Sequence, residues 1–452
     1  MTNGTDTRMI ALELLQEILE NNEYSHIAVG NALNKVQYLP KVERAFINRL
    51  VDGTVENQIR LDYILNQFSS VKTKKMKAVI RNILRMGVYQ LVFMDSVPDS
   101  AACNEAVKLA QKKGFYSLKG FVNGVLRNVE RKKDQIVYPD RGKNPKEFLS
   151  VYYSMPAWIV DRWTEEYGEE KTECILKAFL TDHPTTIRCL NYKENQEAAL
   201  EELRDQDATV EKAPYLPYAW YLSDYGHLAG LKAFATGKIV VQDISSMLAG
   251  EIADPKQGDM ILDLCAAPGG KSIHVADKMA GTGQVEARDL TEYKVELIRE
   301  NIERTGLTNI KAVRKDATVL EKEYVGKADI VLADLPCSGL GVIGKKSDIK
   351  YRIDPEKIAE LAQLQKTILH NAASYVKPGG TLIYSTCTIT KEENTDNLKW
   401  FLENYPYETE SLDPYLCEEL KSETTKKGYL QLLPGIHQTD GFFMARLIRK
   451  QE

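Results

Sequence analysis

Hydrophobic residues in the first part of the chain recur every three or four positions. Clear stripes of this kind lie in residues 11–19, 79–91 and 106–110, and residues 6–134 hold few of the alternating patterns that strands produce. Helical spacing places the apolar side chains on one face of a helix, and other helices must cover that face. We therefore predict an all-α helical domain in this region.

A different pattern begins near residue 236, where short apolar runs alternate with amphipathic segments. The expected strands are residues 260–264, 283–287, 310–313, 329–333 and 381–385. The expected helices between them are residues 271–279, 292–304, 359–376 and 391–403. Such alternation indicates a doubly wound, Rossmann-like α/β sheet.

The stretch between these two regions mixes both signals. Short β-like runs lie at residues 185–191 and 219–222, and the Pro- and Gly-containing segment 138–145 has the composition of a linker. We predict three parts: a helical domain at 1–142, a small α+β module at 143–235 and an α/β domain at 236–452. Four aromatic residues of the module either stack on nucleic-acid bases or pack in its core: Tyr215, Tyr218, Trp220 and Tyr221.

Charge is distributed unevenly along the chain. Residues 1–150 contain 23 Lys and Arg against 16 Asp and Glu, whereas the remaining residues contain 36 against 48. A basic region on an acidic protein suggests a polyanionic partner such as RNA, although solvated basic helices give the same composition. Four arginines therefore have two interpretations, phosphate contact or a structural ion pair on a solvated helix face: Arg49, Arg81, Arg85 and Arg127.

The composition also disfavours several classes of protein. No apolar run approaches the roughly 18 residues of a membrane-spanning helix, and the first residues lack the basic and apolar segments of a signal peptide. The seven cysteines never occur in Cys-x-x-Cys spacing, and the six histidines are dispersed. We therefore expect a cytoplasmic protein with no membrane partner, no metal site and no disulfide framework.

One glycine-containing turn has the form of a cofactor site. The apolar run 261–264 leads into a turn and then into an expected helix, through Cys265, Ala266, Ala267, Pro268, Gly269, Gly270 and Lys271. Backbone N–H groups at such a junction attract anionic groups, and glycines allow a ligand to approach closely. The spacing fits neither Gly-x-Gly-x-x-Gly nor a Walker loop, which counts against nucleoside triphosphate binding.

Two acidic residues follow the next expected strands. Asp289 comes 26 residues after Asp263, where an acid can accept hydrogen bonds from a ribose diol, as in dinucleotide-binding folds. Asp316 follows strand 310–313 and is placed to receive the amino group of an adenine. A single Asp at a strand end also serves as a helix cap or turn residue, so both interpretations stand.

Asp334, Cys337 and Cys387 come just after the expected strands 329–333 and 381–385. Ligands bind at the carboxyl edge of open α/β sheets. A thiolate that adds to carbon 6 of a cytosine makes carbon 5 nucleophilic, and a carboxyl group near N3 stabilises the charge that develops. Nearby positive charge would favour the thiolate, but the sequence does not identify its source.

Three motifs together strongly resemble the RNA cytosine-C5 methyltransferase family. They are Asp-Leu-Cys-Ala-Ala-Pro-Gly-Gly-Lys at 263–271, Asp-Leu-Pro-Cys-Ser-Gly at 334–339 and Ser-Thr-Cys-Thr at 385–388, and the resemblance covers 236–452. It implies that Cys387 is the nucleophile and that Cys337 assists product release. It also implies S-adenosyl-L-methionine (SAM) as cofactor.

The resemblance assigns further roles and shows two departures. It implies that Asp334 contacts the target base and the cofactor, and that the turn 265–271, Asp289 and Asp316 bind SAM. Position 335 is Leu where Ala is usual, and Arg288 stands where the family has a small or apolar residue. These two substitutions raise the possibility of a narrower pocket and an altered SAM affinity.

The helical region resembles the NusB-like RNA-binding fold in residues 11–19, 45–54, 83–91 and 120–127. A NusB-like domain joined to this catalytic domain is similar to the RsmB (Fmu/Sun) type of ribosomal RNA small-subunit cytosine-C5 methyltransferase. The resemblance implies 16S rRNA as substrate, naked or in early assembly intermediates, and we expect a monomer. The alternatives are the same chemistry on tRNA or 23S rRNA, and a non-catalytic RNA-binding or antitermination factor.

Overall fold

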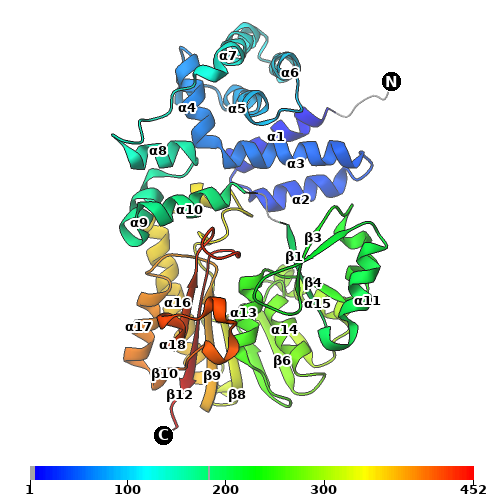
Figure 1. Cartoon of the computed structure of the whole chain (residues 1–452), viewed down its shortest axis with the longest axis vertical. Helices are drawn as coiled ribbons and strands as arrows, with labels where there is room; N and C mark the ends of the chain where they lie inside the picture. The colour runs from blue at the N-terminus through cyan, green and yellow to red at the C-terminus, as the bar shows by residue number, and fades with distance from the viewer. Residues whose placement is uncertain (1–5, 182–183, 452) are drawn as a thin grey trace. The chain divides into compact units, whose positions relative to one another are not determined.

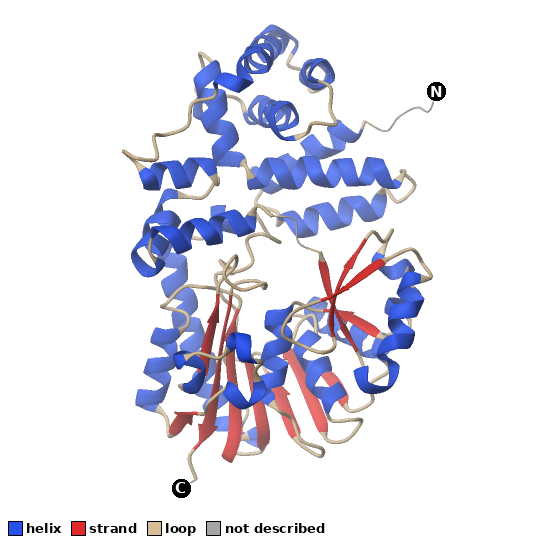
Figure 2. Cartoon of the chain, in the orientation of Figure 1, coloured by secondary structure: helices blue, strands red, loops and turns tan. Residues whose placement is uncertain are grey.

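The computed structural model describes residues 6–181 and 184–451, and the chain divides into two compact units. The first unit contains Met1–Thr181 together with the segment Ile343–Arg352, and the second contains Asp182–Val342 and Ile353–Glu452. Figure 1 follows the chain through both units. Figure 2 shows that the first unit is helical and that the strands belong to the second.

Helices build the first unit. In chain order they are α1 (Thr7–Leu19), α2 (Ser25–Lys35), α3 (Lys41–Glu56), α4 (Gln58–Phe68), α5 (Ala78–Phe93), α6 (Asp99–Lys112), α7 (Lys119–Lys132), α8 (Pro145–Tyr152), α9 (Ala157–Tyr167) and α10 (Glu169–Phe179). α5 packs against α1, α3, α4, α6 and α7. At Gly53 of α3 an added β-carbon would lie 2.0 Å from the Tyr89 ring of α5, so only glycine permits this approach. The predicted helical domain is confirmed.

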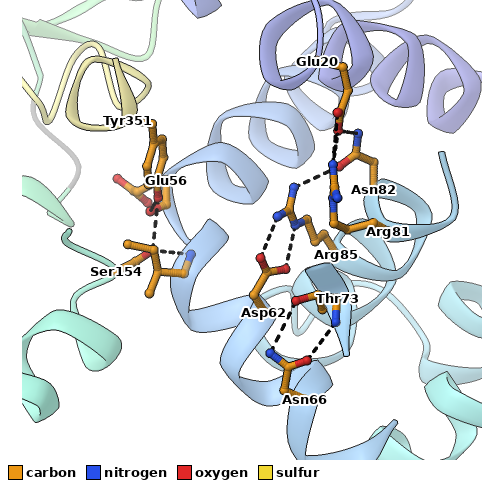
Figure 3. Close-up of polar contacts among 11 residues, drawn as sticks. Glu20, Glu56, Asp62, Asn66, Thr73, Arg81, Asn82, Arg85, Ser154 and Tyr351 are labelled. Carbon is orange, nitrogen blue, oxygen red and sulfur yellow. Dashed lines mark hydrogen bonds and ion pairs between the residues drawn. The ribbon is translucent and has the colours of Figure 1, made fainter. Parts of the chain in front are cut away.

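Three of the four arginines considered for RNA contact are held by acidic partners. Arg85 is buried and donates hydrogen bonds of 2.8 and 2.6 Å to the two carboxylate oxygens of Asp62. Arg81 donates two bonds to Glu20, at 2.8 and 3.0 Å, and both clusters are visible in Figure 3.

The third of them, Arg127, forms an ion pair of 2.8 Å with Glu130. For Arg81, Arg85 and Arg127 the structure thus favours a structural role. Arg49 is exposed, and its role stays a prediction.

The segment Ile343–Arg352 packs with the helices of the first unit, although its position in the sequence lies inside the expected catalytic domain. Asp348 accepts hydrogen bonds from the backbone N–H and the hydroxyl of Ser25, at 3.2 and 2.5 Å. Lys350 donates to the carbonyl of Glu56 at 2.8 Å, and burial lowers the pKa of Lys350 to about 8. The α/β domain predicted at 236–452 is therefore interrupted by a segment that belongs to the helical unit.

The second unit begins with a small antiparallel sheet of order β2-β3-β1-β4. Its strands are β1 (Thr185–Cys189), β2 (Thr209–Lys212), β3 (Ala219–Ser223) and β4 (Ile239–Val241), with helices α11 (Tyr192–Arg204) and α12 (Lys232–Ala235). β4 pairs with β1, so this sheet takes a strand from beyond residue 235, the predicted end of the module.

The aromatic residues of this module serve its packing. Tyr218 is buried, and its hydroxyl lies 3.2 Å from the His274 ring nitrogen. Trp220 donates its ring N–H to Gln196 at 3.1 Å. Tyr215 and Tyr221 are partly buried against the hydrophobic core. These contacts favour packing over base stacking.

The larger sheet has the order β10-β12-β9-β8-β5-β6-β7 within the described residues, with β11 beside β12. The strands are β5 (Met260–Asp263), β6 (Gln284–Asp289), β7 (Ile310–Arg314), β8 (Ala328–Asp334), β9 (Val376–Thr386), β10 (Tyr407–Thr409), β11 (Tyr429–Leu432) and β12 (Phe442–Arg449). The helices are α13 (Ile244–Ala253), α14 (Gly270–Lys278), α15 (Glu292–Thr305), α16 (Pro355–Tyr375), α17 (Thr395–Asn404) and α18 (Glu423–Lys426). β9, β8, β5, β6 and β7 run parallel to one another, whereas β12 is antiparallel to β9.

Helices cover both faces of this sheet because successive side chains of each strand point to opposite faces. Ile261 and Ile383 face the core that contains α13, α14 and α15. Their neighbours Leu262 and Leu382 face the core that contains α16 and α17. The predicted doubly wound sheet is confirmed, and Figure 2 shows its helices on either side of the red strands. No helix within the described ranges is both long enough and apolar enough to span a membrane.

Candidate active site

The candidate residues gather at the carboxyl edge of the parallel strands. Asp263 ends β5, Asp289 ends β6 and Asp334 ends β8, while Cys387 follows β9 directly. Because these strands are parallel and adjacent, their carboxyl ends meet at one edge of the sheet. Asp316 comes two residues after β7, the outermost strand of this group.

Two thiols meet at this edge. The sulfur atoms of Cys337 and Cys387 lie 3.2 Å apart, and both side chains are partly exposed. Cys337 lies on the loop after β8 and Cys387 on the loop after β9, and these two strands are hydrogen-bonded neighbours. The hydrogen bond to Cys387, together with burial and the nearby Glu393 carboxylate, raises the pKa of Cys337 well above that of an ordinary thiol. The pair therefore starts with Cys337 as a neutral thiol.

An ion pair lies beside the thiols. The Lys271 ammonium donates to Asp334 Oδ2 at 2.7 Å, and the Ser385 hydroxyl donates to Oδ1 of the same carboxylate at 2.8 Å. Lys271 also lies 5.1 Å from the centre of the Phe442 ring.

Lys271 also interacts electrostatically with Cys387. Burial acts to lower its pKa, but the charge and the hydrogen bond of Asp334, together with the charges of Asp263 and Cys387, outweigh burial and raise the pKa of Lys271. A cation that interacts with Cys387 favours its thiolate form, so Lys271 is a candidate for the positive charge that the sequence left open.

The turn at 265–270 has the geometry of a cradle for a small ligand. Gly269 has a φ of 105°, in the left-handed region that favours glycine, and it is the N-cap residue of α14. The backbone N–H of Ala266 donates to the carbonyl of Arg288 at 2.7 Å, and that of Ala267 donates to Asp289 Oδ2 at 3.1 Å. These bonds tie the turn after β5 to the end of β6.

A buried carboxylate beside this turn fits a cofactor with a donor group. Asp263 accepts a hydrogen bond from the Ser272 hydroxyl at 2.6 Å through Oδ2, while its buried Oδ1 has no partner in the described structure. Burial raises the pKa of Asp263 to about 7. The unpaired buried oxygen suits the ammonium of an amino-acid-like ligand such as SAM, and the backbone N–H groups at the start of α14 suit its carboxylate.

Asp289 and Asp316 differ in their surroundings. Asp289 is buried and also accepts a bond from the backbone N–H of Leu290 at 2.8 Å. Asp316 is exposed, and its Oδ1 accepts bonds from the backbone N–H and the hydroxyl of Thr318, at 2.9 and 2.7 Å. Asp316 thus acts as a turn residue in the structure, and the predicted contact between Asp316 and adenine stays a proposal.

The two departures from the family pattern are both buried side chains. Leu335 is buried in the core that contains α16 and α17. Arg288 is buried, pairs with Glu286 at 2.6 Å and lies 4.2 Å from the centre of the Tyr324 ring. Both side chains make these contacts among buried residues, and their effect on pocket width and SAM affinity stays a prediction.

Several polar residues that contact the site were not among the predicted site residues. Ser385 could have been predicted, because it lies in the motif 385–388 that contains Cys387. Three buried polar residues could not, because they lie within segments expected to be ordinary helices: Gln365, Glu393 and Asn394. Within the described ranges, no group of three or more His, Cys, Asp or Glu side chains is arranged to hold a metal ion.

Comparison with known proteins agrees with this architecture. Residues 251–448 match the family described as 16S rRNA methyltransferase RsmB/F, residues 5–131 match the NusB family, and residues 155–228 match the ferredoxin-like domain of RsmF/B-like methyltransferases. The crystal structure of PH0851 is similar, with a TM-score of 0.82 and 27% identity, covering 98% of this chain and 99% of that one.

Curated relatives match over nearly the full length. The probable ribosomal RNA small subunit methyltransferase B of Bacillus subtilis is 37% identical and covers 99% of each chain. The probable protein of the same name from Synechocystis is 33% identical, covering 97% of this chain and 98% of the relative. The chain therefore belongs to the 16S rRNA methyltransferase RsmB/F family.

Proposed function

We propose that this SAM-dependent methyltransferase modifies carbon 5 of cytosine 967 in 16S rRNA, through a covalent bond between Cys387 and carbon 6 of the base. The observation that carries the proposal is the 3.2 Å sulfur pair of Cys337 and Cys387 beside the Lys271–Asp334 ion pair. Two adjacent thiols at the carboxyl edge of the sheet suit a covalent mechanism in which one thiol attacks and the other assists release.

The first step uses Cys387 and Asp334. The Cys387 thiolate, stabilised by Lys271, forms the S–C6 bond, and the electron pair of the C5=C6 bond moves toward C5 and N3. We assign Asp334 and its partner Lys271 to the target base, where the proton held between them can hydrogen-bond to N3 and so stabilise the negative charge that develops on the ring. Bound SAM supplies the electrophilic methyl group that the C5 electron pair attacks.

Release reverses the addition and needs a base. Removal of the C5 proton restores the C5=C6 bond, and the electrons of the S–C6 bond return to Cys387. We assign the base to Cys337 because its sulfur is 3.2 Å from that of Cys387. The hydrogen bond to Cys387 contributes most to the raised pKa of Cys337, so we expect this pKa to fall once Cys387 is bonded to carbon 6. Cys337 then loses its proton to solvent more readily at the stage when a base is needed.

SAM is assigned to the turn and the strand ends around it. The residues that would hold it are Cys265, Ala266, Ala267, Pro268, Gly269, Gly270, Lys271, Asp289, Asp316 and Asp334. Asp289 is suited to a diol because its carboxylate is fixed by the backbone of the turn. Asp263 adds an acceptor that the sequence did not suggest.

The RNA partner follows from the family and the domain composition. A NusB-family domain and small-subunit methyltransferase relatives support 16S rRNA over tRNA or 23S rRNA. We infer that the substrate is naked 16S rRNA or an early assembly intermediate, and that a monomer acts on it in the cytoplasm. The target cytosine must leave its stack to reach Cys387, which favours an unpaired site.

The experiment that tests this function is transfer of labelled methyl groups from SAM to unmodified 16S rRNA, 23S rRNA and tRNA, each offered separately. We expect label in 16S rRNA alone, and bisulfite sequencing should place it at cytosine 967. Parallel reactions with assembled small subunits distinguish naked RNA from a particle as substrate. Label at another nucleotide, or mainly in tRNA or 23S rRNA, would contradict the substrate assignment.

Replacing Lys271 with methionine should lower kcat about 10²- to 10³-fold, because it removes a preorganised charge and leaves Asp334 without its cation. The assay is methyl transfer to 16S rRNA at saturating SAM. Lys278→Met is a matched control, since Lys278 lies on the same helix and forms a 2.8 Å ion pair with Glu251 away from the thiols. Equal activity of both variants would show that Lys271 has no catalytic role.

A further inference from the structure

The loop that carries Cys337 is held on both sides by buried polar side chains. Gln365 of α16 donates to the carbonyl of Pro336, the residue before Cys337, at 2.9 Å. Ser338, the residue after Cys337, donates from its backbone N–H to Glu393 Oε1 at 2.8 Å and from its hydroxyl to Oε2 at 2.6 Å. Both hydrogen bonds of Ser338 are made to the carboxylate of Glu393. This carboxylate therefore fixes both the orientation of the Cys337 loop and its distance from Glu393.

The Glu393 carboxylate is buried and has several hydrogen-bond donors around it. Its side chain is fully buried, and besides Ser338 it accepts hydrogen bonds from Thr390 at 2.6 Å and Gln365 at 3.1 Å. Burying a carboxylate costs free energy that these bonds only offset, so it is poor evidence for a gain in stability. A rigid carboxylate with four donors is, however, well suited to positioning a loop.

The neighbouring residue holds the loop that carries Cys387. Asn394 Oδ1 accepts a hydrogen bond from the Thr386 hydroxyl at 2.5 Å, and Nδ2 donates to the carbonyl of Thr388 at 3.0 Å. Nδ2 also donates to Gln431 at 2.7 Å. The residues before and after Cys387 are therefore both bound to one buried amide.

The position of Asn394 in the fold supports a dedicated role. It is the N-cap residue of α17, where an Asn side chain usually accepts a bond from the first turn of the helix. Here the side chain makes no such cap and contacts the Cys387 loop instead. A direct bond of 2.7 Å between the hydroxyls of Ser338 and Thr388 joins the two cysteine loops.

We propose that Glu393 and Asn394 form a clamp that positions the two thiols, with Glu393 setting Cys337 for release and Asn394 setting Cys387 for attack. The inference rests on the proposed function, because it assigns different steps to the two thiols. Two consecutive residues act on both loops, so the clamp fixes one thiol relative to the other. Neither residue touches the reacting atoms in this account, and both are positioning residues.

The test compares Glu393→Gln and Asn394→Asp with Asp396→Asn, an exposed control in the first turn of the same helix. We expect each clamp variant to lower kcat about 10- to 100-fold, with KM for RNA and SAM affinity within about 2-fold, because a small misplacement of reacting groups costs this much. Glu393→Gln should accumulate a covalent RNA–protein species, and Asn394→Asp should not. Glu393→Asp retracts the carboxylate and should behave like Glu393→Gln even if the amide variant is poorly folded.

A second readout separates this inference from the proposed function. Alkylation of the RNA-free protein by iodoacetamide, followed by peptide mass spectrometry, should show a several-fold change confined to Cys337 in Glu393→Gln and to Cys387 in Asn394→Asp. If Cys337→Ala traps no RNA but alkylation changes in this way, the clamp stands and the assignment of catalytic steps fails. Clamp variants that match Asp396→Asn in both turnover and alkylation would overturn the clamp.

Discussion

Cys387→Ala is expected to abolish methyl transfer to 16S rRNA, lowering kcat about 10⁴- to 10⁶-fold, as loss of a covalent nucleophile does. Without the S–C6 bond, carbon 5 lacks the electron density to attack the methyl group. SAM binding should be nearly unchanged, because the turn at 265–270 does not depend on Cys387. The measurement is tritium transfer from SAM to unmodified 16S rRNA over a long incubation.

Cys417→Ala is the matched control for that substitution. Cys417 is a partly exposed cysteine like Cys387, but it packs against the core near α13 and follows no strand of the parallel group. We expect the control to keep nearly full activity. Substantial methyl transfer by Cys387→Ala would show that another group activates the cytosine.

Cys337→Ala should have the second largest effect, because it blocks release and leaves attack intact. We expect methylation of about one RNA per enzyme molecule, followed by turnover slowed about 10²- to 10⁴-fold, the usual contribution of a general base. Rapid-quench measurement of labelled RNA against active-site concentration gives both the amount of RNA methylated per enzyme molecule and the later turnover rate. Steady turnover at the wild-type rate would contradict the role of Cys337 in elimination.

The strand ends at the active site could be predicted from the sequence. A buried parallel strand appears in the sequence as a run of apolar residues, and the direction of the chain shows which end of that run is the carboxyl end. Asp334 and Cys387 were placed in this way, and both lie at the predicted edge. Their adjacency depends on β8 and β9 being neighbours, which the pattern of elements does not specify by itself. The resemblance to the family supplied that relation and the roles of the two cysteines.

Other features depend on tertiary contacts, which cannot be predicted from the spacing of hydrophobic residues. The expected helix 391–403 begins at Thr395, because Glu393 and Asn394 bind the cysteine loops instead of continuing the helix. β12 was not among the expected strands, since its first residues are buried on both faces and show no alternation. The segment Ile343–Arg352 gave no signal that it packs with distant helices, because its bonds are to side chains and carbonyls far away in the sequence.

The central claim is a covalent bond from Cys387 to RNA that Cys337 helps to break, and a denaturing gel tests it most directly. Cys337→Ala and Cys387→Ala proteins are each mixed with SAM and unmodified 16S rRNA, then separated under denaturing conditions. We predict a stable RNA–protein band for Cys337→Ala and none for Cys387→Ala. The reverse pattern would make Cys337 the nucleophile, and no band from either variant under conditions where wild-type enzyme methylates the RNA would contradict the covalent mechanism.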